Sequence, residues 1–469
     1  MAKSEVAFYL VSACVLGIFI GSLPLPIFAI IASGVLIIFF APQIRLTRNI
    51  AILMCISMFF GYCYVFLFQN IQTIQLRLPE PREVKVLEAL IISEPQAAKN
   101  SVRMTAELQE PYHGVVTILT NDALDIHYGD MVSVRGRIER NDNRPPMIPF
   151  PGIEITERNH GSLFMRTLLQ LKRSAIGQFK KFLPTESAAF LAGLTLGSRE
   201  EFSESFKQRM SDAGTSHLTA LSGYNIAILI AAITVVLRNL VGRRMRFILT
   251  VTIIIAFVIM VGGESSVIRA AIMGFLVILA QETGRIYAAR NAIAVTAFLM
   301  LIFDPMLLNS NIGFQLSFLS LVGIIYLAPI FLTFLKAKNN PGLFGLREHL
   351  ATTLAAQLMV IPVIVLAFGE FSLTAIIANI LVLEVVPITM FLGFLLILIG
   401  SLLPFMGFVI AQFVLVPLTY MQVVIDIFAQ LRLPFGPTLF TGASIAVYYF
   451  ILMVFIIRNS QKTKSYEIA

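Results

Sequence analysis

The stretch His217-Leu-Thr-Ala-Leu-Ser-Gly-Tyr-Asn225 opens an apolar segment that continues to Leu237. It places an imidazole, two aliphatic hydroxyls and an amide at the beginning of a segment long enough to cross a bilayer. Polar groups are costly in hydrocarbon, so those found in membrane spans usually face a cavity, a pore or one another. The stretch therefore predicts a polar passage or a polar site inside the membrane.

The composition of the whole chain is that of a membrane protein. Hydrophobic residues make up 57% and charged residues 13% of the 469 residues, against about 45–50% and about 25% in soluble domains. The mean hydropathy is +0.83. The three cysteines, Cys14, Cys55 and Cys63, lie in apolar runs without metal-ligand spacing. We therefore expect no metal, no cofactor and no disulfide framework.

The formal net charge of +8 is unevenly distributed along the chain. Residues 69–165 hold 10 Lys/Arg and 13 Asp/Glu, so the basic excess lies in the rest of the chain, mostly in short loops between apolar segments. The positive-inside rule places such loops in the cytoplasm. Counting from either end then puts both termini in the cytoplasm and residues 69–165 outside. The basic charge indicates topology and is no evidence for nucleic-acid binding.

These patterns predict a polytopic α-helical membrane protein of about 12 spans with an inserted small β-barrel, OB-like and extracytoplasmic. The expected parts are N-terminal spans (1–68), the β domain (69–160), amphipathic interfacial helices (161–213) and a transmembrane channel domain (214–469). The apolar runs expected to form helices are 6–21, 27–40, 50–68, 217–237, 247–262, 267–281, 291–303, 312–335, 350–368, 373–400, 405–429 and 441–457.

Alternating apolar and polar residues predict short strands in the β domain. The expected strands are 84–92, 102–108, 115–119, 132–138 and 153–155, and five such strands suit an OB-fold. The four prolines within 141–151 indicate a loop. Residues 163–182 form an amphipathic pattern, which fits either a helix lying on the membrane surface or a helix packed on the bundle. A second amphipathic helix is expected over 200–212.

Further polar residues lie within or at the ends of the predicted spans: Glu264, Arg269, Asn311, Gln315, Gln357, Asn379, Glu384 and Asp426. Any one of them can be satisfied by a hydrogen bond between helices. Glu264 could pair with Arg269, or Arg269 could face an anionic substrate. As a set, they favour a hydrated path. The helix-breaking pairs Ser222-Gly223 and Gly262-Gly263 would let backbone groups face that path.

Several of these segments resemble the ComEC competence proteins. The resemblance is carried by Asp212-Ala-Gly-Thr-Ser-His-Leu-Thr-Ala-Leu-Ser-Gly-Tyr-Asn-Ile226, Ser266-Val-Ile-Arg-Ala-Ala271, Asp304-Pro305, Gly313-Phe-Gln-Leu-Ser-Phe318, Ala356-Gln357, Phe368-Gly-Glu-Phe-Ser-Leu373 and Ala378-Asn379. These motifs follow the family's order and cover roughly residues 160–400. Apolar runs followed by an OB-like domain also match the family.

The resemblance implies an inner-membrane channel that carries single-stranded DNA into the cytoplasm during natural transformation. Its path would be lined by His217, Ser222, Gly223, Asn225, Glu264, Arg269, Asn311, Gln315, Gln357 and Asn379. An external OB-like domain would contact DNA through Arg103, Tyr112, Tyr128, Arg135 and Arg137, although its net charge is acidic and a structural cap is the alternative. OB-folds bind single strands with cations and stacking aromatics.

The implied partners are a DNA receptor, a cytoplasmic ATPase or helicase and a separate nuclease. A motor is expected because the chain has no P-loop. A separate nuclease is expected because the chain ends at Ala469 without the metallo-β-lactamase-like domain that the family often carries. Asn225 stands where the family often has histidine, which leaves hydrogen bonding rather than proton transfer as its role.

Other functions remain open at this point. An intramembrane enzyme or small-solute transporter would use Ser222 as nucleophile and His217 as base. On one helix these residues lie about 140° apart, which is poor geometry for a direct hydrogen bond. A family member without a role in competence is a further alternative. We expect a channel without enzymatic activity.

Overall fold

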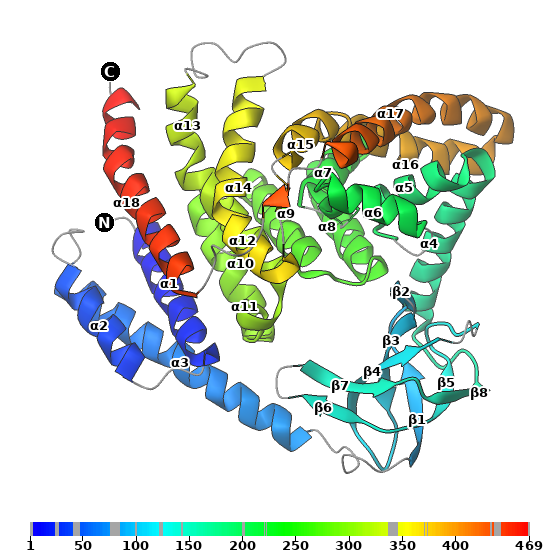
Figure 1. The fold of residues 1–469 in the computed structure, drawn as a ribbon, viewed down its shortest axis with the longest axis horizontal. Helices are drawn as coiled ribbons and strands as arrows, with labels where there is room; N and C mark the ends of the chain where they lie inside the picture. Colours follow the sequence, from blue (N-terminus) through cyan, green and yellow to red (C-terminus); the bar gives the residue numbers. More distant parts are fainter. Residues whose placement is uncertain are drawn as a thin grey trace.

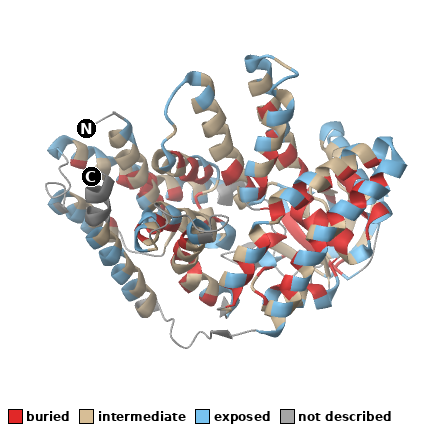
Figure 2. Cartoon of the chain, turned by 90° about the horizontal axis from the view of Figure 1, so that it is seen from above, coloured by how far each residue is buried: buried red, intermediate tan, exposed pale blue. Residues whose placement is uncertain are grey.

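A helical body and one β domain make up the molecule, and a long helix leads from the β domain into the body (Figure 1). The computed structural model describes residues 3–23, 28–40, 47–75, 85–98, 101–121, 125–141, 144–198, 202–219, 221, 223–335, 346–369, 371–372, 374–431, 434–435 and 442–467. Figure 2 shows buried residues gathered inside the helical body and exposed ones along its outer helices.

The first three helices are α1 (Lys3–Ser22), α2 (Phe28–Phe40) and α3 (Arg48–Gln75). Glycines let α1 and α3 approach each other closely. A Cβ added to Gly17 would collide with the carbonyl of Met58, and one added to Gly61 would collide with the carbonyl of Cys14. Small residues at a helix crossing allow the backbone contact that stabilises helix pairs in membranes.

This close contact predicts that Gly17→Ala destabilises the protein. The added methyl group must push α3 away, which costs about 1–3 kcal/mol. Gly34→Ala is the matched control, because its Cβ would stand 3.7 Å from Met58 Cε, an ordinary contact. Thermal melting in detergent should show a lower midpoint for Gly17→Ala and an unchanged or higher one for Gly34→Ala. Equal midpoints would contradict the proposed packing.

The later apolar runs form helices close to the predicted positions. They are α7 (Gly223–Leu237), α8 (Arg243–Met260), α9 (Ser265–Thr283), α10 (Ala289–Phe303), α11 (Leu307–Ser310), α12 (Ile312–Tyr326), α13 (Ala328–Phe334), α14 (Leu346–Phe368), α15 (Ala375–Leu383), α16 (Val386–Leu402), α17 (Pro404–Gln430) and α18 (Gly442–Glu467). The predicted run 312–335 is divided between α12 and α13, and the run 373–400 between α15 and α16.

Prolines account for these two divisions. Pro329 and Pro387 stand in the first turn of α13 and α16, where the missing N–H is tolerated. The axes bend by 43° and 47° at the two breaks. Among the described residues, six helices are long and apolar enough to cross a membrane, or up to eight if each bent pair is one span. The predicted count of twelve is not confirmed.

A third proline lies at the contact between α14 and α18. Pro362 lies inside α14 and has no N–H to donate to the carbonyl of Leu358, four residues earlier. The hydroxyl of Tyr448 on α18 donates to that carbonyl at 2.7 Å, and Tyr449 donates to the carbonyl of Met359 at 2.9 Å. The neighbouring helix thus satisfies a backbone group that the proline leaves free.

The β domain is one mixed sheet of eight strands. They are β1 (Lys85–Ile91), β2 (Gln96–Ala98), β3 (Ser101–Leu108), β4 (Gly114–Thr120), β5 (Met131–Gly136), β6 (Glu139–Asn141), β7 (Arg144–Pro149) and β8 (Gly152–Glu157). The order is β6-β7-β4-β3-β1-β5-β8, with β2 pairing β3. The described residues show no pairing between the end strands β6 and β8, so the OB-like closed barrel is not confirmed.

The predicted loop over 141–151 is wrong, because β7 occupies most of it. Met147 and Ile148 pair in parallel with Thr117 and Ile118 of β4, and Met147 also faces Glu139 of β6. Pro149 is the last residue in the pairing. A proline at the end of a strand removes a donor where the ladder stops, so a proline-rich segment can still form a strand. The five predicted strands correspond to β1, β3, β4, β5 and β8 and lie within about two residues of their predicted positions.

The chain passes from the β domain into the body through α4 (Leu163–Phe182), followed by α5 (Thr185–Leu196), α6 (Glu204–Asp212) and the 3-10 turn η1 (Ser216–Leu218). The C-terminal end of α4 packs on the bundle. The ring of Phe182 fills the space left by Gly400 and Gly407 and meets Phe408 edge to face at 5.1 Å. The apolar helix α5 is almost wholly buried and packs against α4, α16 and α17.

Candidate functional site

The first turns of α9 connect three segments of the predicted channel. The Ser266 hydroxyl donates to the carbonyl of Leu221 at 2.8 Å, and the Ser265 hydroxyl donates to Asn311 Oδ1 at 3.0 Å. One turn further, Arg269 Nη1 donates to the carbonyl of Ser317 at 2.8 Å. The start of α7, the beginning of α9 and the first half of α12 are therefore held together by polar contacts.

Arg269 is the most unusual residue of this site. It is 8% exposed, although it carries a charge inside an apolar helical body. Among the described residues, Arg269 forms no ion pair with a carboxylate, and its buried Nε has no hydrogen-bond partner. A buried charge is expensive unless it is paired. An anionic group next to this guanidinium would therefore be strongly favoured.

Gly223 makes room for the guanidinium. A Cβ added at Gly223 would lie 2.9 Å from Arg269 Nη2 and 3.6 Å from the Cβ of Ala270. Before α9, Gly262 and Gly263 have φ values of +89° and +62°, which residues with a Cβ rarely adopt. The two predicted helix-breaking positions therefore turn the chain at one end of α9 and clear space beside Arg269.

We expect Gly223→Val to displace the Arg269 guanidinium and to reproduce the effect of removing it. The matched control is Gly242→Val, because an added Cβ at Gly242 meets no atom of the described residues within 4 Å. The readout is the DNA uptake that the resemblance to competence proteins implies: at equal membrane levels, cells should show at least a tenfold loss only for Gly223→Val. Equal uptake by both variants would show that the space beside Arg269 is unimportant.

The other predicted residues of this region have separate roles. The buried Asn225 amide donates to the carbonyl of Leu194 at 3.0 Å, so it faces α5. Asn311 caps α12 by accepting from the N–H of Phe314 at 2.8 Å. Gln315 donates to the carbonyl of Leu308 at 2.9 Å and so holds α11 against α12. These contacts stabilise the helices around Arg269.

Two predicted residues at the edge of this region are exposed. His217 lies in η1, and Glu264 is the N-cap residue of α9, where it forms no ion pair with Arg269 among the described residues. Ser222, the nucleophile of the alternative enzyme hypothesis, lies outside the described residues. Because Glu264 does not pair with Arg269, the alternative that Arg269 faces an anionic substrate remains.

Farther along the chain, the polar residues fall into two groups. Asp426 Oδ1 lies 2.7 Å from Arg209 Nε, and Glu384 Oε1 lies 3.0 Å from His349 Nε2, so these residues connect helices. In contrast, the buried Gln357 Oε1 and Asn379 Oδ1 have no hydrogen-bond partner in the described part of the chain. Buried oxygens of this kind cost about 1–3 kcal/mol each, so they favour a polar occupant between the helices.

The structure does not bring the five predicted DNA contacts of the β domain together. Arg135 pairs with Val86 near the beginning of β1, whereas the turn containing Tyr128 bonds to Ile91 at its end. These positions are about 17 Å apart along the strand. Tyr112 accepts a hydrogen bond from Lys85 at 3.2 Å, near Arg135. Arg103 faces Gln96 of β2, and Arg137 is exposed after β5.

Sequence-based reasoning did not single out a set of cations on α4 as a binding site. Arg166, Arg173 and Lys180 recur every seven residues and line cavities between α4 and the β domain. In the sequence, the seven-residue spacing indicates only the polar face of an amphipathic helix. Only the position of the β domain beside α4 shows that a cavity faces these residues.

Comparison with known proteins identifies the chain's relatives. Residues 194–462 match the competence protein family, which is more than half of the chain and includes the whole Arg269 site. The chain belongs to this family. The ComE operon protein 3 of Bacillus subtilis (strain 168) is 27% identical over 219 residues, which is 46% of this chain and 27% of that protein. No solved structure matches this member of the competence family.

Proposed function

We propose that this member of the competence family is an inner-membrane channel that passes single-stranded DNA into the cytoplasm during natural transformation. The single observation that carries this proposal is the buried guanidinium of Arg269, which has no carboxylate partner among the described residues. A passing phosphodiester would supply the missing negative charge. The proposal assigns Arg269 a binding role and assigns the chain no catalytic step.

Two other features support a polar path through the helical body. The unpartnered oxygens of Gln357 and Asn379 lie in the same half of the chain. The bent pairs α12–α13 and α15–α16 interrupt apolar segments. In membrane proteins, such breaks are tolerated where the backbone faces protein or a water-filled cavity. A hydrated path would satisfy both the side-chain oxygens and the broken helices.

The orientation of the protein in the membrane is part of the proposal. In Figure 1 the β domain lies at the bottom, and the C-terminal end of α18 lies at the top, on the far side of the helical body. This arrangement supports a β domain outside the cell and a cytoplasmic C-terminus, and the positive loops predict a cytoplasmic N-terminus as well. DNA would then meet the β domain before it enters the helical body.

The proposed channel acts with partners. Its 469 residues contain no P-loop, so a cytoplasmic ATPase or helicase would pull the strand. A DNA receptor would deliver the duplex from outside, and a separate nuclease would remove the strand that does not enter. The size of the strand that passes would be set by the space around Arg269 and its neighbours.

Arg269→Ala tests the proposal directly. In a deletion strain complemented with the variant, entry of labelled DNA into a compartment protected from external nuclease should fall at least tenfold. Arg269→Lys should retain part of the activity, since it keeps the charge and loses the planar donor geometry. Arg244→Ala is the control, because Arg244 is exposed at the beginning of α8.

Each variant must match the unaltered protein in membrane level and melting temperature. A loss of uptake then results from the missing charge and not from a damaged fold. Normal uptake by Arg269→Ala would rule out the proposed role of this residue. An equal loss in Arg244→Ala would show that uptake depends on total positive charge, and it would also contradict the proposal.

A further inference from the structure

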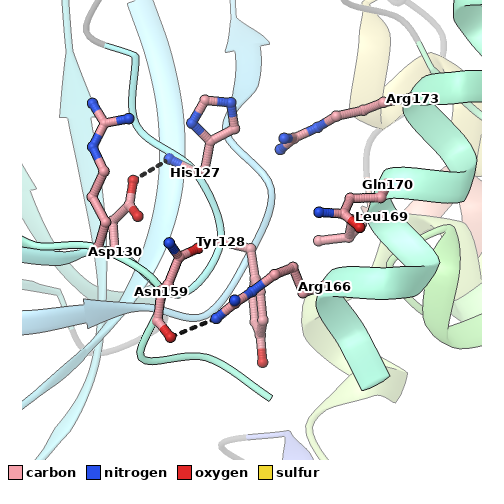
Figure 3. Close-up of a pocket in the computed structure, with 9 residues that line it drawn as sticks. His127, Tyr128, Asp130, Asn159, Arg166, Leu169, Gln170 and Arg173 are labelled. Carbon is pink, nitrogen blue, oxygen red and sulfur yellow. Dashed lines mark hydrogen bonds between the residues drawn. The ribbon is translucent and has the colours of Figure 1, made fainter. Parts of the chain in front are cut away.

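A cavity of about 150 Å³ lies between the β domain and the outward face of α4 (Figure 3). One wall consists of loop residues of the β domain, and the other consists of residues of α4. The lining residues are His127, Tyr128, Asp130, Arg158, Asn159, Arg166, Leu169, Gln170 and Arg173. Figure 3 shows Arg166 and Arg173 extending from α4 toward the β domain. Cations therefore reach into the cavity from the helix.

The carboxylates around this cavity are already engaged. The side chain of Asp130 accepts a hydrogen bond from the N–H of His127 at 2.8 Å. Asp125 lies 3.6 Å from Arg158. Glu94 Oε2 is 2.7 Å from the buried Lys172 Nζ, and its other oxygen is 3.4 Å from Arg173 Nε. Lys172 is thus the closer partner of Glu94, and most of the Arg173 guanidinium is available to a ligand in the cavity.

The Arg166 side chain is held in place, but not all of its N–H groups have a hydrogen-bond partner. Its Nη2 donates to the carbonyl of Asn159, which fixes the side chain across the cavity. Its buried Nε has no hydrogen-bond partner in the part of the chain that the structure describes. A guanidinium has five donors in a planar fork that matches the oxygens of a phosphate. The fixed position of Arg166 leaves donor capacity for such a group.

The cationic surface continues along α4. A second cavity of about 310 Å³ shares His127 and Arg173 with the first and reaches Lys180. Residues seven apart lie on nearly the same face of an α-helix, so Arg166, Arg173 and Lys180 form one row about 21 Å long. A row of this length can contact several successive phosphates of a strand, whereas a single small anion would occupy only one position.

We propose that this groove binds the phosphate backbone of a single-stranded nucleic acid and guides it toward the helical body. The assignment rests on the proposed function, since it names an entry site for the same strand. Tyr128 lines the groove and offers an aromatic ring near the cations, the combination that sequence-tolerant single-strand sites use. The exposed apolar residues Phe164 and Leu171 lie about 160–180° around α4 from Arg173, so a lipid headgroup in the groove would not place its tails against them.

The test is binding of a fluorescent oligothymidylate to the full-length chain in nanodiscs of neutral lipid. Arg166→Gln combined with Arg173→Gln should weaken binding at least tenfold. The plot of log affinity against log salt should become shallower by about 1.4, since each lost phosphate contact removes about 0.7 for a single strand. Arg238→Gln combined with Arg244→Gln is the control, because Arg238 is exposed just after α7 and Arg244 is exposed in the first turn of α8.

Unchanged affinity and salt slope in the groove variant would overturn the proposal, as would an equal loss in the control variant. Flotation with phosphatidylcholine vesicles containing phosphatidylglycerol distinguishes a lipid site. Loss of vesicle binding with retained oligonucleotide binding would assign the groove to lipid and also overturn the proposal. The readouts separate the two proposals: unchanged oligonucleotide affinity and salt slope in the groove variant contradict the groove, whereas normal DNA uptake by Arg269→Ala contradicts the channel role of Arg269.

Discussion

The charge of Arg269 inside an apolar body is the constraint on which the site depends. Helices α7, α9 and α12 meet there because Gly223 leaves space for the guanidinium and the carbonyl of Ser317 accepts from it. Ser265 and Ser266 of α9 donate hydrogen bonds to Asn311, which caps α12, and to Leu221, just before α7. One hydrogen bond to a neutral carbonyl does not offset the burial of a full charge. The arrangement is therefore complete only with an anion, and a DNA strand is a continuous series of anions.

The site around Arg269 and the groove beside α4 share one feature, an arginine whose hydrogen-bond donors are only partly used. Both use arginines whose geometry is fixed by backbone carbonyls, Ser317 in one case and Asn159 in the other. Both leave a buried Nε without a hydrogen-bond partner among the described residues. The helix α4 joins the two regions physically, since its cationic face lines the groove and its last turn packs on α16 and α17 through Phe182. A strand held in the groove would thus lie beside the route to the helical body.

The sequence predicted the elements better than their connections. Apolar length placed the helices, and alternation placed five strands, because both patterns are local. The prolines Pro329 and Pro387 divided two predicted spans, and β7 formed despite its prolines through pairing with a strand about 30 residues earlier. Such pairing is not encoded in a local pattern. Likewise, the sequence identified Arg269 but not its partner Ser317, which is 48 residues away.

The measurement that tests the account most directly is photo-crosslinking during DNA uptake. A photoreactive amino acid would replace Ser266, on the same turn of α9 as Arg269, or Phe413, whose side chain is exposed on the outside of α17. The account predicts crosslinks between the entering strand and position 266, and none at position 413. Crosslinks at position 413 alone, or at neither position while uptake proceeds, would contradict a strand path beside Arg269.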